Sequence, residues 1–448
     1  MTAGDLRRRW GVDGATVLTC YIWLLLAVPS VMVIAPLGSA GAPSTIVAIG
    51  LFLLWAWFEL HRSAGSGRHR QPVRLAALGW LLAMVAVYAH AMSSPMAFDE
   101  ISPADFGMLK LIGFTGVLLT AGDGLSNLAR FRVLVGRFVL AAGAIAALGL
   151  LQFVTRDLFV DRLQIPGLTS VSGSAGLIDR GGLPRPSGTS THPIEYGVVL
   201  SIVLPLSIVH ALWATQRRWL YRAVVGVIAL DIFLSSSRSA LVCSAVALVV
   251  LAVNWRWRLR LQAAAASVVL ALAVYLLVPG SLGATTRLFT GAGNDPSIAS
   301  RTGSYHIVSV FFGHSPILGR GFGTFLPKYW ILDNGYLGLL VEGGLVGLAG
   351  LLVLVLAGLA SARAARTQLP ELFDQQLAQG VLASVASGAA GLAFFDTFGF
   401  PQSAGCFFIV LGLAAALRRL SRQDAAPLAP DPQPARASAP ASESVVGR

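Results

Sequence analysis

Long apolar runs dominate this sequence and exclude most soluble folds. Stretches of about 20 apolar residues, the length of helix that crosses the hydrocarbon core of a bilayer, recur along the chain. Only 12% of the 448 residues are charged, about half the share in a soluble globular protein. So few charged side chains cannot cover a soluble particle of this size. The pattern predicts an all-α polytopic membrane protein.

The apolar segments predict about 12 transmembrane helices, within a domain that covers residues 17–420. The first run follows three arginines, as a signal peptide does, but its length favours an uncleaved helix. Two connecting segments are too long to be simple turns, namely about 156–191 and about 280–332, the large loop between helices 9 and 10. The predicted spans are 17–37, 44–60, 74–91, 106–121, 132–155, 192–214, 219–236, 238–254, 259–279, 333–360, 372–397 and 402–418.

Basic residues predict how these helices are oriented. If residues 1–16 are cytoplasmic, 23 of the 33 Lys and Arg fall in inside segments, as the positive-inside rule requires. The tail 421–448, rich in Pro, Ala and Ser, is then also cytoplasmic and is predicted to be disordered. Topology therefore explains most of the net charge of +12, and the surplus does not indicate nucleic-acid binding.

Ten basic residues are predicted to lie on the outer side, against this bias. Arginine suits bidentate contact with phosphate or carboxylate, so these residues are candidates for binding an anionic ligand. For Arg156 and Arg162, pairing with Asp157 and Asp161 is the simpler explanation. Arg185 lies between two prolines, which restrict the backbone, and both roles stay open there. The ten are Lys110, Arg156, Arg162, Arg180, Arg185, Arg238, Arg287, Arg301, Arg320 and Lys328.

Arg238 is the most informative of these residues. It follows Ser235-Ser236-Ser237 at the outer junction of two apolar runs. A charge so close to hydrocarbon is costly and is usually retained for a partner or a ligand. Ligand binding is favoured, and a structural pair with Asp231, two helical turns earlier, is the alternative.

The second outer loop contains Arg301 and Arg320 and ends at Asp333. Glycines on both sides of Arg320 are expected to permit a tight turn. Asp333 opens the tenth predicted helix, where it could be an N-cap or a general base at the outer surface.

The sequence gives little support for a metal site or for disulfide bonds. No two histidines have the spacing of a helical metal site, so neither a metal nor a cofactor is expected. The cysteines Cys20, Cys243 and Cys406 all fall inside predicted spans and are expected to be small apolar residues.

These motifs, in this order, resemble the O-antigen ligase and polymerase superfamily, often called Wzy-C. The resemblance covers about residues 185–360 and the twelve-helix layout. It is carried by Thr191-His192-Pro193-Ile194-Glu195-Tyr196-Gly197, Ser237-Arg238-Ser239-Ala240, Arg301, Pro316-Ile317-Leu318-Gly319-Arg320-Gly321-Phe322-Gly323, Asp333-Asn334-Gly335-Tyr336-Leu337 and Glu342-Gly343-Gly344.

The resemblance implies a metal-independent, inverting glycosyltransferase of GT-C type in the bacterial cytoplasmic membrane. Such proteins move a glycan from undecaprenyl pyrophosphate to an acceptor hydroxyl of a glycan or lipid on the outer face. It implies that Arg238 and Arg301 bind the pyrophosphate, with Arg185, Arg287 and Arg320 as further candidates. Asp333 stands where the family has a catalytic His before Asn, which makes repeat-unit polymerisation somewhat more favoured than ligation.

A twelve-helix transporter or flippase of a lipid-linked or anionic substrate is the alternative. A transporter is expected to show internal repeats and ionisable groups near the middle of the membrane. The sequence shows no repeat, and Glu195 and Asp231 are its main candidates for such groups. A receptor or scaffold explains the outer arginines less well.

Overall fold

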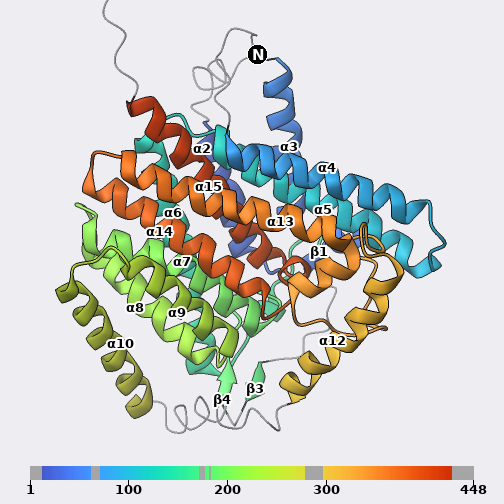
Figure 1. The fold of residues 1–448 in the computed structure, drawn as a ribbon. Helices are drawn as coiled ribbons and strands as arrows, with labels where there is room; N and C mark the ends of the chain where they lie inside the picture. The colour runs from blue at the N-terminus through green and yellow to red at the C-terminus, as the bar shows by residue number, and fades with distance from the viewer. Residues whose placement is uncertain (1–12, 62–70, 171–176, 181–182, 278–295, 426–448) are drawn as a thin grey trace, which may run out of the picture.

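The computed structural model describes residues 13–61, 71–170, 177–180, 183–277 and 296–425. Within these ranges the chain forms thirteen α-helices and four strands of two or three residues, which confirms the all-α class (Figure 1). The helices are α2 (Gly14–Ala27), α3 (Pro43–Leu60), α4 (Pro72–Met92), α5 (Phe98–Asp123), α6 (Leu128–Thr155), α7 (Pro193–Trp213), α8 (Arg218–Leu234), α9 (Arg238–Ala252), α10 (Trp257–Leu277), α12 (Pro296–His314), α13 (Gly335–Gln368), α14 (Leu372–Leu392) and α15 (Pro401–Ala425).

The helix starts follow from local sequence. Proline is the first residue of α3, α4 and α7, a position where its missing N–H costs nothing. Side chains cap other starts: Asp13 accepts from Thr16 N in α2, and Asn127 accepts from Arg130 N in α6. Each cap satisfies an N–H that has no partner within the helix.

Eight of the described helices are long and apolar enough to cross a membrane, and α2 and α9 are shorter apolar helices. Except for the first, each predicted span coincides with one helix to within a few residues at most ends, although α5 begins at Phe98 rather than near 106 and α13 continues to Gln368. The chain is a multi-pass helical membrane protein. The additional helix α12 lies within the second predicted outer loop.

The prediction for the first span was wrong at its end. Helix α2 stops at Ala27, because Pro29 forces the preceding residue Val28 into an extended conformation. Residues Met32–Val33 then form β1, which pairs antiparallel with β2 (Thr169–Ser170), and Ala35–Gly41 form the short 3-10 helix η1. The chain after α2 therefore packs against the first long loop.

We call the end of the bundle at which α7, α9, α13 and α15 begin the loop end, because both long loops lie there. At the opposite end, the predicted cytoplasmic end, ion pairs join helices that are far apart in sequence. Arg130 lies 2.5 Å from Asp13, and Arg132 lies 2.5 Å from Asp374.

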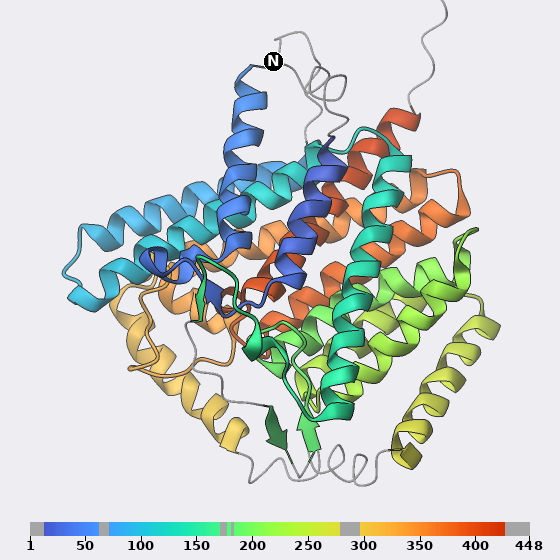
Figure 2. The ribbon, with the colours of Figure 1, turned by 180° about the vertical axis from the view of Figure 1, so that it is seen from behind.

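Helices α7 and α15 occupy the interior of the bundle. In the most apolar 18-residue stretch of each, 83% and 89% of the residues are buried. In contrast, only 6% of the residues in the corresponding stretch of α10 are buried, and this helix lies at the edge of the bundle (Figures 1 and 2). Lipid is therefore the expected neighbour of α10. Helices α7 and α15 are packed inside the bundle, so their own N-termini at the loop end have fixed positions.

Candidate active site

The junction between α8 and α9 places Arg238 at the loop end. Ser236 has a φ of 47°, and the side chain of Ser237 caps α9 by accepting from Ala240 N at 3.4 Å. Arg238 is the first residue of α9 and is half-buried. Its position combines a guanidinium with the positive end of a helix dipole, an arrangement that favours an anion.

Arg185 reaches the same junction from the first long loop. It ends β4 (Leu183–Arg185), which pairs with β3 (Ile178–Arg180), and its side chain is only 5% exposed. Its Nε donates to the carbonyl of Ser235 at 2.8 Å, three residues before Arg238. The structure thus brings together two arginines that are 53 positions apart in the chain.

Buried polar side chains fix the loop that carries Arg185. Gln152 of α6 donates to the carbonyl of Gly188 at 2.8 Å and accepts from the backbone N–H of the same residue at 2.8 Å. Gln402 of α15 donates to Thr189 at 2.9 Å and accepts from Ser190 at 2.5 Å. Because every one of these bonds is buried, the loop has a single defined path over α6 and α15.

Replacing Gln152 with alanine is expected to destabilise the protein by on the order of 3 kcal/mol, because it leaves buried backbone groups without partners. Leu151→Ala is the matched control, since Leu151 is 49% exposed in the same helical turn. Thermal unfolding in detergent measures both. Equal melting temperatures for the two variants would contradict the role of Gln152 in fixing the loop that carries Arg185.

Asp231 and Glu195 have protein partners instead of facing an open pathway. Tyr196 donates its hydroxyl to Asp231 at 2.6 Å. Glu195 accepts from the backbone N–H groups of Thr191 at 2.9 Å and of Gln402 at 2.8 Å. Both carboxylates tie helices together, which weakens the transporter alternative and gives Asp231 a partner other than Arg238.

The N-cap of α7 is His192, which accepts from Ile194 N at 3.1 Å through Nδ1. Burial, assisted by the nearby charge of Arg185, lowers the pKa of His192 from 6.5 to about 4. The imidazole is therefore neutral at pH 7, and its proton sits on Nε2 so that Nδ1 can accept.

This pKa predicts a pH-dependent stability. As the pH falls from 6.5 to about 4, the unfolded chain takes up a proton on His192 that the folded chain does not bind, so the free energy of unfolding decreases. His192→Asn keeps a cap acceptor but does not titrate, and its melting temperature is expected to fall less over this pH range. Identical pH dependences for the two proteins would refute this contribution of His192.

Asp333 lies immediately before α13 but is not its cap. Asn334 performs that function, because its Oδ1 accepts from the backbone N–H groups of Tyr336 at 3.0 Å and Leu337 at 3.1 Å. The N-cap explanation of Asp333 was therefore wrong. Asp333 is half-buried, and two residues later the backbone N–H of Gly335 donates to the carbonyl of Phe395 at 3.1 Å, which ties the start of α13 to the connection between α14 and α15.

A second carboxylate that the sequence did not single out, Asp396, lies close enough to Asp333 to interact with it electrostatically. Burial raises the pKa of Asp396, Lys110 opposes the rise and Asp333 adds to it. Asp396 nevertheless keeps surface that is accessible to solvent. The sequence predicts one span over 372–397, which hides Asp396 at the end of an apolar run. In the structure α14 ends at Leu392, so Asp396 lies in the connection that follows.

Lys110 lies close enough to Asp396, in the connection between α14 and α15, to interact with it electrostatically, and its predicted place on the outer side of the membrane stays a prediction. Helix α5 begins at Phe98, so Lys110 lies three turns inside it. Asp99 and Glu100 occupy the first turn, where carboxylates stabilise the helix dipole.

Two further basic residues of the second loop pair with this acidic turn. Arg320 donates to both carboxylate oxygens of Glu100, at 2.7 and 2.8 Å, and its guanidinium lies over the ring of Tyr329. Lys328 lies 2.5 Å from Asp99. In the same way, Arg162 pairs with Asp157 at 2.6 Å, as expected. Arg320 therefore has a structural partner, and its role in binding pyrophosphate stays a prediction.

Arg287 lies outside the described residues. Arg301 is in α12, but its side chain also lies outside the described part of the structure. Its backbone position is one turn before Ser304, which accepts from Trp330 at 3.1 Å. Val308 of α12 packs in a small apolar cluster with Val341 of α13 and with Leu332, the residue before Asp333.

The end of α14 lies between the two parts of the site. Leu392 lies against Gly335 at the start of α13, whereas Gly391 lies against Val198 of α7 and Cys243 of α9. The N-termini of α7, α9 and α13 are therefore grouped around one helix end. This arrangement places the arginines of the α8–α9 junction on one side and Asp333 with Asp396 on the other.

The fold and these polar groups define a multi-pass membrane protein in which two arginines meet at the α8–α9 junction and Asp333 and Asp396 lie across α14 from them. Residues 223–352 match the family model described as O-antigen ligase, Wzy_C, a segment that includes Arg238, Arg301 and Asp333. This match supports the resemblance to the O-antigen ligase and polymerase superfamily. The match supports a role as a membrane enzyme of glycosyltransferase type. A comparison with curated proteins gave no match.

Proposed function

We propose that this protein is an inverting glycosyltransferase that moves glycan from undecaprenyl pyrophosphate to an acceptor hydroxyl. The observation that carries the proposal is the grouping of Arg185 and Arg238 at one helix junction, across α14 from Asp333. It is supported by the match of residues 223–352 to the O-antigen ligase family.

The reaction needs two kinds of group. The acceptor oxygen attacks the anomeric carbon from the face opposite the leaving group, and the bond from this carbon to the pyrophosphate oxygen breaks. Negative charge then develops on the pyrophosphate, and preorganised arginines stabilise such charge effectively in a site with little water. We assign this role to Arg238 and Arg301, with Arg185 beside them.

The acceptor hydroxyl loses its proton as it attacks, and we assign Asp333 as the base that accepts it. The carboxyl group of Asp396 lies close enough to Asp333 to interact with it electrostatically. No metal is assigned a part in this scheme.

The proposed location is the bacterial cytoplasmic membrane, with both termini in the cytoplasm and the loop end outside. It rests on the distribution of basic residues and on the position of the long loops. The lipid tail of the donor then stays in the bilayer, while its pyrophosphate reaches the arginines at the helix ends.

We favour polymerisation of repeat units over ligation, because Asp333 replaces the His expected for ligases. The test is the glycan profile of a strain from which this protein is deleted. Single repeat units that accumulate on the lipid support a polymerase, whereas long chains left on the lipid indicate a ligase. An unchanged profile, together with no transfer by the purified protein from lipid-linked glycan, would refute the proposed function.

A further inference from the structure

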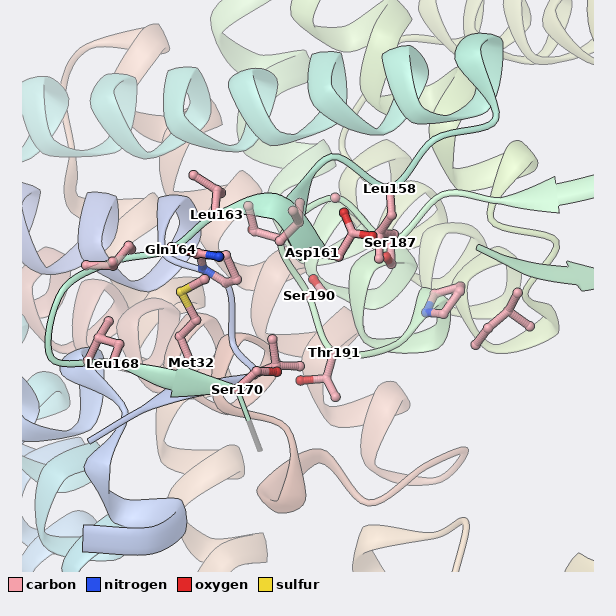
Figure 3. A pocket seen from close by; sticks show the side chains of 18 of the residues that line it. Met32, Leu158, Asp161, Leu163, Gln164, Leu168, Ser170, Ser187, Ser190 and Thr191 are labelled. Carbon is pink, nitrogen blue, oxygen red and sulfur yellow. The ribbon is translucent and has the colours of Figure 1, made fainter. Parts of the chain in front are cut away.

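A cavity of about 770 Å³ lies at the loop end, separate from the residues around Asp333. Three parts of the chain line it: the segment after α2, the loop after α6, and the segment that joins Arg185 to α7 (Figure 3). Its volume is in the range of small-molecule binding sites. The first two parts are joined by the β1–β2 pairing, so the cavity depends on the early end of α2.

The walls of the cavity combine polar and apolar groups. Arg185, Ser187 and Ser190 are buried polar residues on one side, held in place by Gln152 and Gln402. Leu163 and Leu168 contribute apolar surface from the loop after α6 (Figure 3). Sugars present hydroxyl edges and apolar C–H faces, so they fit such a mixed wall.

The exposed side of the cavity is also polar. Asp161, Gln164 and Thr191 line the cavity and are exposed to solvent. An oligosaccharide can therefore enter the cavity with one end and continue into solvent with the other. The cavity is built from loops and short strands beyond the helix ends, so a lipid tail in the bilayer is a less suitable occupant.

Arg185 connects this cavity to the proposed pyrophosphate site. It lines the cavity, and its Nε is bonded to Ser235 beside Arg238. The cavity thus lies on the side of the leaving group, across α14 from Asp333. A ligand that extends from the pyrophosphate site into it belongs to the donor, whereas the acceptor approaches from the side of the base.

We propose that this cavity binds the glycan of the lipid-linked donor, beyond the sugar attached to pyrophosphate. This inference rests on the proposed function. It makes the first long loop a determinant of which donor the enzyme uses, in addition to the family segment 223–352.

The experiment compares the wild type with Leu163→Trp, which places a larger side chain on the wall of the cavity, and with Gln164→Ala, a milder variant at its exposed side. Arg162→Ala is the matched control, because Arg162 lies between cavity residues but pairs outward with Asp157. Two donors are assayed: the full lipid-linked repeat unit, and undecaprenyl pyrophosphate that carries a single sugar. Thermal unfolding checks that each variant is folded.

The wild type is expected to show a KM for the full donor about tenfold below that for the single-sugar donor, and Leu163→Trp is expected to lose this preference. Gln164→Ala should lose part of it, and Arg162→Ala should keep it. A preference that survives in both cavity variants would overturn the proposal. So would a rise in the KM of the acceptor alone, which would place the acceptor in the cavity.

Direct binding separates this inference from the proposed function. The lipid-free repeat-unit oligosaccharide is expected to bind the wild type and to bind Leu163→Trp about tenfold more weakly in calorimetry. Absence of transfer by the wild type, together with an unchanged glycan profile in the deletion strain, would refute the proposed function. Equal binding of the oligosaccharide to both proteins would refute the cavity proposal, whether or not transfer occurs.

Discussion

Replacing Arg238 with alanine is expected to lower the rate of glycan transfer by about 10²- to 10³-fold, the usual loss when a preorganised group that stabilises developing charge is removed. Arg238 begins α9 beside Ser235, to which Arg185 is bonded, so its loss removes a charge from the proposed leaving-group site. Arg238→Lys is expected to retain partial activity, because lysine keeps the charge without the bidentate geometry.

The assay measures transfer from lipid-linked glycan by purified protein. Arg258→Ala is the control, since Arg258 is an exposed arginine of α10 near the opposite end of the bundle. Thermal unfolding should show that both variants are folded. Wild-type activity in Arg238→Ala would remove Arg238 from the mechanism.

Replacing Asp333 with asparagine is expected to have the second large effect, a loss of about 10²- to 10⁴-fold in kcat, the contribution typical of a general base. Binding of the donor should persist, because the arginines on the other side of α14 are unchanged. Asp333→His is expected to restore part of the turnover, since an imidazole can also accept the proton of the hydroxyl.

The helix cap beside Asp333 provides the matched comparison. Asn334→Ala removes a side chain that accepts two backbone hydrogen bonds and is expected to lower the free energy of unfolding by about 1 kcal/mol. Asp333→Asn should leave the melting temperature near that of the wild type. Normal turnover in Asp333→Asn would show that this carboxylate is not the base.

The helical part of the fold could be predicted because hydrophobicity and length act locally. A run of apolar residues that matches the bilayer forms a helix whatever its neighbours are, and eleven of the twelve predicted spans coincide with single helices. The first prediction extended too far because residues 30–37 are apolar for another reason. Met32 and Val33 of this segment pair with Ser170 and Thr169, more than 130 residues away, and the chain then enters the 3-10 helix η1.

The candidate site was predictable only where one residue stood out against its surroundings. Arg238 is a charge between two apolar runs, and Asp333 is a charge immediately before a long apolar run, so both attract notice in the sequence. Asp396 does not, because it follows Phe394 and Phe395 and resembles the end of a span. Its proximity to Asp333 depends on how α13 meets the connection between α14 and α15.

The sequence by itself determined that this protein is a multi-pass helical membrane protein, and it predicted which arginines oppose the topology bias and to which superfamily the central segment is related. Only the tertiary structure decided which groups those arginines contact. Arg320 pairs with Glu100 and Arg162 with Asp157, whereas Arg185 joins the junction of Arg238. The physical reason is that hydrophobic burial acts on each segment separately. An ion pair or a cavity instead requires groups from distant segments, and packing alone brings these together.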